Sequence, residues 1–150
     1  MKDFEYLNPA KIIFGAEPYK KVESALVSRS VKSILLIYSG EYIKDLGIYQ
    51  EIETICNNNN IKLTANGSVV PNPKVELVRE LIEQARENKV DFIIAVGGGS
   101  SVDTAKAVSI GVSYNGDVWD FFEGKATVGE VLPIGVITTI PASGSKTFNS

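Results

Sequence analysis

Short apolar runs alternate with amphipathic segments along the whole chain. Apolar or β-branched runs bounded by turn residues predict strands, whereas apolar residues at a spacing of three and four predict helices. The predicted strands cover Tyr6 with residues 11–14, and then 33–38, 61–64, 92–96 and 134–138. The predicted helices cover 19–27, the segment from Ser39-Gly40 to the asparagine run 57–60, 76–87 and 102–110.

This alternation predicts an α/β fold built from parallel β-α-β units. We expect a Rossmann-like, open and mostly parallel sheet with helices on both faces. The nearly continuous apolar run 33–38 is typical of a strand that is covered on both sides. At 150 residues the chain has the length of one domain.

Three glycines, Gly97–Gly99, separate the predicted strand 92–96 from the predicted helix 102–110. Glycines permit a ligand to approach the backbone closely, and a helix N-terminus offers free N–H groups and a favourable dipole to phosphate. The run does not satisfy the dinucleotide fingerprint G-x-G-x-x-G. The alternative is an ordinary helix start, because Ser100 and Asp103 also fit a capping box.

Ligands gather at the carboxyl ends of the strands in such a sheet. That rule brings together three loops rich in Gly, Ser or Thr, at residues 39–42, 97–101 and 138–145. Together they predict a site for an extended phosphorylated ligand. The alternative is that they are only turns, in which these residue types are common.

Composition narrows the choice of chemistry and partners. The net charge is −3 with no basic run, which argues against nucleic acid as a partner, and no apolar stretch is long enough to span a membrane. The start, Met1–Glu5, lacks the apolar core of a signal peptide, and the single Cys56 suits a reducing cytoplasm. The chain has no histidine, so imidazole catalysis and histidine metal ligation are excluded for these residues. Cys56 continues an apolar helical stripe and is expected to be a small buried hydrophobe.

Five short blocks stand in a fixed order along the chain. They are Asn8-Pro9-x-Lys11-Ile12-Ile13-Phe14-Gly15, Val70-Pro71-Asn72-Pro73, Ala95-Val96-Gly97-Gly98-Gly99-Ser100-x-x-Asp103-x-x-Lys106-Ala107, Asn115–Phe122, and Pro133-Ile134-Gly135 with residues 138–145. In this order and spacing the chain resembles the iron-containing (group III) alcohol dehydrogenases, in their butanol-dehydrogenase-like branch. Glycerol dehydrogenase and dehydroquinate synthase relatives share the glycine loop, but the block Asn115–Phe122 favours the alcohol dehydrogenase branch.

The resemblance implies a dehydroquinate-synthase-like N-terminal domain that binds nicotinamide dinucleotide. It places the pyrophosphate on the glycine loop, the nicotinamide ribose side near Asp103, and the adenine end beside Pro71-Asn72-Pro73. The cofactor-binding residues are then expected to be Ser39, Gly40, Glu41, Asn72, Gly97, Gly98, Gly99, Ser100, Asp103, Thr138, Thr139, Ser143 and Ser145. Lys106 could also reach a phosphate, although most lysines at such positions are solvated.

The resemblance further implies a small alcohol or aldehyde substrate and a homodimer. It places the catalytic iron or zinc on an aspartate and three histidines of a second, helical domain, which we expect to be absent from residues 1–150. We therefore expect the nicotinamide half of a dehydrogenase, without turnover by these residues alone. A stand-alone binding module and an inactive remnant are the alternatives.

Two positions depart from the family pattern. Lys146 stands where the family has a glutamate, which reverses a charge at the expected cleft. Ser39-Gly40-Glu41-Tyr42 stands where the related branch tends to have G-G-G-S. A carboxylate there accepts hydrogen bonds from ribose hydroxyls and repels a 2′-phosphate, so we expect NAD(H), with NADP(H) as the alternative.

Overall fold

A computed structural model describes residues 11–14, 19–40, 42–70 and 74–137. Its centre is a five-stranded sheet in the order β1-β5-β4-β2-β3, in which every neighbouring pair is parallel. The strands are β1 (Lys11–Phe14), β2 (Ser33–Ile37), β3 (Lys62–Asn66), β4 (Phe92–Val96) and β5 (Ile134–Ile137). The predicted α/β class and open parallel sheet are confirmed.

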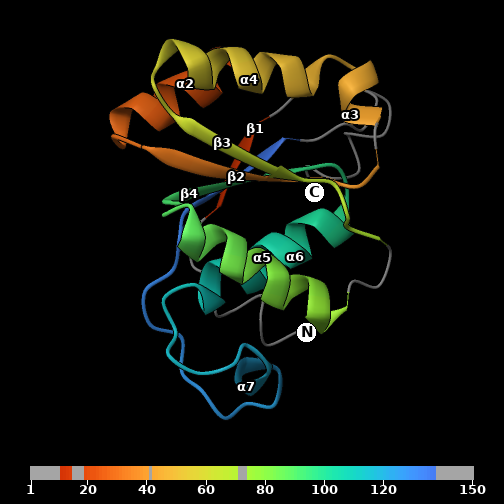
Figure 1. Ribbon diagram of the computed structural model, residues 1–150, viewed down its shortest axis with the longest axis vertical. Coiled ribbons are helices and arrows are strands. Elements are labelled where there is room, and N and C mark those ends of the chain that lie inside the picture. The colour runs from red at the N-terminus through yellow and green to blue at the C-terminus, as the bar shows by residue number, and fades with distance from the viewer. Residues whose placement is uncertain (1–10, 15–18, 41, 71–73, 138–150) are drawn as a thin grey trace.

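Helices cover both faces of this sheet, α2 and α4 on one side and α5 and α6 on the other (Figure 1). The chain steps from β2 outward to β3, and then crosses back over β2 to reach β4. Because parallel crossovers are right-handed, this change of direction moves the connecting helices to the opposite face. The helices are α2 (Tyr19–Ser28), α3 (Tyr42–Asp45), α4 (Ile48–Asn58), α5 (Val75–Glu87), α6 (Gly99–Gly111) and α7 (Trp119–Phe122).

The three interior strands, β2, β4 and β5, are buried along their whole length. In β2, Leu35 and Ile37 pack toward α5 and α6, whereas Ile34 and Leu36 pack toward α2 and α4. The residues of β4 alternate between the same two cores. Burial on both faces explains why these strands consist of continuous apolar runs instead of alternating ones.

The helices differ from the prediction at three places. The single helix expected after Ser39-Gly40 is divided into α3 and α4, because Gly47 takes a left-handed conformation with φ of 78°. The helix after the glycine run begins at Gly99 instead of residue 102. The short α7 lies on the α5 and α6 side, away from the sheet (Figure 1), and was not predicted.

Three helices end in the same way before the next strand begins. Ser30, Asn60 and Lys89 have positive φ values of 56°, 55° and 52°. The N–H of the following residue then reaches back to a carbonyl five residues earlier, in the pairs Val31–Leu26 (3.0 Å), Ile61–Cys56 (2.8 Å) and Val90–Ala85 (2.9 Å). This is the hydrogen bond of a Schellman motif, and the buried apolar residue after each turn directs the chain into the sheet.

The carboxylate of Asp91 joins the beginnings of β2 and β4. It accepts hydrogen bonds from the backbone N–H groups of Lys32 and Ser33 at 3.1–3.2 Å. The N–H of Asp91 donates to the carbonyl of Ser33 at 2.9 Å, and the Ser33 hydroxyl donates to the carbonyl of Asn88 at 2.8 Å. These contacts fix the register of the two strands that carry the candidate site at their other ends.

Lys89→Gly should stabilise the fold. Lys89 is exposed and left-handed, so glycine removes backbone strain while adding some freedom to the unfolded chain. We expect the free energy of unfolding to rise by about 0.5–1 kcal/mol in urea titrations followed by circular dichroism. Lys89→Ala keeps the Cβ atom and should leave stability unchanged, and Asn60→Gly should gain less because asparagine tolerates this conformation. A lower stability for Lys89→Gly would contradict this explanation.

Candidate functional site

The carboxyl ends of β2 and β4 lie next to each other, with Ile37 paired to Ala95. From this point the chain continues outward in opposite directions, toward β3 from β2 and toward β5 from β4. Open parallel sheets bind ligands in the crevice outside the carboxyl ends where the strand order reverses. The structure therefore brings the loop at Ser39-Gly40 and the loop at Gly97–Gly99 to this one edge.

Gly97 makes the sharp turn from β4 into α6. Its φ of 114° lies in a region that L side chains rarely adopt, and its N–H donates to the carbonyl of Ile137 at 3.1 Å. This first glycine of the run is therefore required by the backbone. It attaches the start of the glycine loop to the neighbouring strand β5.

Gly98 and Gly99 are not required in the same way. Gly98 has an ordinary extended φ of −94°, and a Cβ atom added at either residue would meet no atom of another described part of the fold within 4 Å. Both residues are exposed at the first turn of α6, whose N-cap is Gly98. The first-turn N–H groups of a helix have no acceptor within the helix, so they are available to an anion. The fold itself does not require glycine at these two positions. Close approach of a ligand to this backbone would explain why glycine is present there.

The capping-box interpretation of Ser100 and Asp103 is wrong. Among the described residues no side chain caps α6, and Ser100 is the second residue of the helix instead of the residue before it. Ser100 and Asp103 are half-buried, one turn apart on α6. Lys106 is buried at 4% exposure and is not the solvated lysine that is usual at such positions.

The loop after β2 is held by a turn that follows β3. Gly40 is left-handed with φ of 72°, and its N–H donates to the carbonyl of Gly67 at 3.2 Å. Ser39 forms an antiparallel bridge with Ser68. The N–H of Gly40 is therefore used inside the protein, so Gly40 can offer close approach to a ligand but not this donor.

The structure places seven of the thirteen predicted site residues at or next to this edge of the sheet. These are Ser39, Gly40, Gly97, Gly98, Gly99, Ser100 and Asp103. The other six lie outside the described residues: Glu41, Asn72, Thr138, Thr139, Ser143 and Ser145. Lys146, the charge reversal noted above, also lies outside them.

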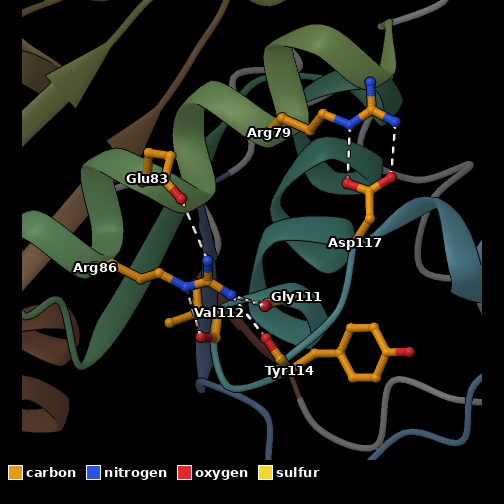
Figure 2. Close-up of polar contacts among 7 residues, drawn as sticks. All are labelled: Arg79, Glu83, Arg86, Gly111, Val112, Tyr114 and Asp117. Carbon is orange, nitrogen blue, oxygen red and sulfur yellow. Dashed lines mark hydrogen bonds and ion pairs between the residues drawn. The ribbon is translucent and has the colours of Figure 1, made fainter.

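The other end of α6 is held by an arginine that the sequence analysis did not single out (Figure 2). The Arg86 side chain on α5 donates to the carbonyls of Gly111 (3.1 Å), Val112 (3.1 Å) and Tyr114 (2.8 Å), and pairs with Glu83 at 3.3 Å. A cation at a helix C-terminus satisfies the last carbonyls and interacts favourably with the dipole. Arg86 thus anchors the helix whose N-terminus forms the candidate site.

About two turns earlier on α5, Arg79 forms a two-pronged ion pair with Asp117 (Figure 2). Its Nε and Nη2 atoms donate to the carboxylate at 2.9 and 2.7 Å. The hydrogen bond from Arg79 holds the pKa of Asp117 below its ordinary value. Both side chains are exposed, so the pair positions the loop after α6 more than it stabilises the fold.

Cys56 is a buried member of the core between the sheet and α4, as predicted. Burial, with a smaller contribution from Glu53, raises the pKa of its thiol to about 11. A thiol with that pKa is a poor nucleophile at neutral pH. Among the described residues no three Cys, Asp or Glu side chains are grouped to hold a metal ion, and no described helix is long and apolar enough to cross a membrane.

Residues 9–150 match the model of a family described as iron-containing alcohol dehydrogenase. The chain belongs to the iron-containing alcohol dehydrogenase family. Two relatives are named for different nicotinamide cofactors. A probable NADH-dependent butanol dehydrogenase 2 of Bacillus subtilis is 38% identical over 146 residues, or 97% of this chain. An NADP-dependent alcohol dehydrogenase 3 of Entamoeba histolytica is 35% identical over an alignment of 153 residues that covers 98% of this chain.

The fold agrees with a solved member of the iron-containing alcohol dehydrogenase family. The crystal structure of an NADH-dependent butanol dehydrogenase A from Thermotoga maritima matches with a TM-score of 0.79 and 38% identity, over 90% of this chain and 34% of that one. The chain spans 37% of the length of the Bacillus relative and 38% of the Entamoeba relative. The family and its oxidoreductase class are therefore established, and the predicted resemblance is confirmed.

Replacing each of the two arginines of α5 in turn should distinguish their contributions to stability. Arg86 anchors α6, whereas Arg79 forms only an exposed ion pair. Arg86→Met removes three hydrogen bonds to carbonyls at the end of α6 and should lower the free energy of unfolding by about 1–2 kcal/mol. Arg79→Met keeps the same stem and loses only the pair with Asp117, which should cost less than about 1 kcal/mol. Equal losses in urea unfolding would contradict the anchoring role of Arg86.

Proposed function

We propose that this chain is the nucleotide-binding part of a metal-dependent alcohol dehydrogenase that transfers hydride between a nicotinamide and a small primary alcohol or aldehyde. The observation that carries the proposal is the open first turn of α6, where Gly98 and Gly99 leave room that no side chain in the described part of the chain fills. Its place at the reversal of strand order, between the ends of β2 and β4, supports a dinucleotide as the ligand.

In the proposed mode the pyrophosphate lies on the N-terminus of α6. The backbone N–H groups of Gly99, Ser100 and Ser101 and the Ser100 hydroxyl are the donors that this turn can supply. Asp103, one turn along α6, would lie toward the nicotinamide ribose. Ser39, Gly40 and Glu41 would contact the adenosine ribose, Asn72 the adenine end, and Thr138, Thr139, Ser143 and Ser145 the remaining side of the cofactor.

The bound nicotinamide would supply the hydride chemistry at its C4 atom. The residues of this chain bind and orient the dinucleotide, and Gly97 and Arg86 fix the two ends of the helix that holds it. The family's iron or zinc does not fit the described residues, because the chain has no histidine and its single cysteine is buried. We therefore propose that the metal is held by residues outside this chain. Activity with the substrate would then need a protein that also contains those residues.

We also propose a homodimer in the cytoplasm as the working form. The dimer follows from the family resemblance of the N-terminal segment. A reducing compartment agrees with a single cysteine that is buried and has no partner for a disulfide within the chain.

The glycine site is tested by adding a side chain where the fold has room for one. We expect Gly98→Val to keep the parent circular dichroism spectrum and to raise the Kd for NADH at least tenfold in calorimetric titration, because the new side chain occupies the proposed pyrophosphate position. Gly129→Val is the matched control, since Gly129 also has open space around it and lies far along the chain from this loop. Unchanged NADH affinity in a folded Gly98→Val variant would contradict the site.

The cofactor preference is tested by titrating the same chain with NADPH. The Glu41 carboxylate should repel the 2′-phosphate, so we expect NADPH to bind at least tenfold more weakly than NADH at about 0.05 M salt, where charge repulsion is little screened. Raising the salt should narrow this difference. Equal affinities for the two cofactors at low salt would contradict the assignment of NAD(H).

A further inference from the structure

The turn after β3 has a structure that the proposed function does not yet explain. We propose that Asn66 is a positioning residue for the cofactor: through the turn at residues 66–69 it fixes the backbone of Ser39-Gly40, and so sets ribose recognition. This inference rests on the proposed function, because it assumes that the Ser39-Gly40 loop meets the adenosine ribose.

Asn66 is the last residue of β3 and bonds through both its side chain and its backbone. Its Oδ1 atom accepts a hydrogen bond from the N–H of Ser68 at 2.9 Å, which closes an Asx turn. Its Nδ2 group donates to Oε1 of Gln84 on α5 at 3.1 Å, and its carbonyl accepts from the N–H of Tyr38 at 3.1 Å. The half-buried side chain of Asn66 therefore connects the turn to helix α5.

The turn at residues 66–69 also holds the loop after β2. The N–H of Gly40 donates to the carbonyl of Gly67 at 3.2 Å, and the N–H of Val69 donates to the carbonyl of Tyr38 at 3.4 Å. These two bonds and the bridge between Ser39 and Ser68 make a short antiparallel pairing that the parallel sheet does not otherwise contain among its described strands. The left-handed Gly40 is set by a bond that exists only when the turn is formed.

Gly67 limits how far this turn can move. A Cβ atom on Gly67 would lie 2.3 Å from Cε2 of Tyr38, so the aromatic ring rests directly on the glycine backbone. Tyr38 is itself buried and makes an edge contact with Tyr49 on α4. The turn is thus held from α5 through Asn66 and from the α4 side through Tyr38.

The two ends of the proposed dinucleotide site consequently depend on different parts of the fold. The pyrophosphate end depends on Gly97 and α6, whereas the ribose end depends on the turn at the edge strand β3. A change at Asn66 should therefore alter the discrimination between NADH and NADPH, which differ only at the adenosine ribose, more than it alters binding of the shared pyrophosphate.

The test compares Asn66→Ala, Asn66→Ser and Asn88→Ala in titrations of this chain with NADH and NADPH. Asn66→Ala should raise the Kd for NADH about fivefold, the equivalent of one hydrogen bond, and lower the ratio of the NADPH and NADH Kd values by a similar factor. Asn66→Ser keeps an oxygen that can accept from the Ser68 N–H and should restore at least half of the lost discrimination on a logarithmic scale. Asn88 is the matched control, because its Nδ2 donates to the Gln84 carbonyl at 2.8 Å beside the opposite end of the sheet. Its loss should reduce stability and leave the ratio unchanged.

If Asn66→Ala does not fold, Gln84→Leu gives the decision, since it removes the contact with α5 and leaves the Asx turn in place. A ratio lowered at least twofold in that variant supports the proposal. An unchanged ratio in folded Asn66→Ala, or in Gln84→Leu where Asn66→Ala does not fold, overturns it while leaving the proposed function intact. Failure of the folded parent chain to bind NADH overturns both.

Discussion

The burial of β2 and β4 on both faces is the constraint on which the other features depend. Two parallel strands without a polar face need helices above and below them, and the chain supplies these by turning outward to β3 and then back across β2. The same reversal leaves the carboxyl ends of β2 and β4 side by side with their loops directed apart. The place of the candidate site is therefore a consequence of how the core is covered.

The two ends of helix α6 differ in a way that makes its N-terminus a candidate site for an anion. Nearly all of the helix beyond its first turn is buried, and Arg86 satisfies carbonyls at its C-terminus. At the N-terminus no side chain of the described residues caps the helix, and an added Cβ atom on Gly98 or Gly99 would find open space among those residues. A buried helix with one satisfied end and one open end presents its unpaired N–H groups from a fixed position.

The sequence predicts what depends on local pattern and misses what depends on distant partners. The strand 92–96 and the fold class follow from apolar runs, and the meeting of the loops at Ser39-Gly40 and Gly97–Gly99 follows from the rule for parallel sheets. The start of α6 is missed because glycines have low helix propensity, which tertiary packing of the buried helix overrides. The left-handed Lys89 has no local signal, since lysine is not a residue that favours this conformation.

The candidate site shows the same division. The glycine run predicts a pyrophosphate position from sequence alone. The hydrogen bond from the Gly40 N–H to the Gly67 carbonyl joins the segments that follow two different strands, β2 and β3, and leaves no mark in either sequence. The role of Arg86 is hidden for the same reason, because its acceptors are backbone carbonyls 25 to 28 residues away. Hydrogen bonds to the backbone place no requirement on the identity of the accepting residue.

The measurement that tests the central claim most directly is an amide spectrum of the isotope-labelled chain recorded with and without NADH. The account predicts saturable shifts concentrated on the amides of Gly98, Gly99, Ser100 and Ser101, with those of Gly111 and Val112 at the anchored end of α6 unchanged. Saturable shifts that leave the first turn of α6 untouched, or the absence of any saturable shift in a folded sample, would contradict it.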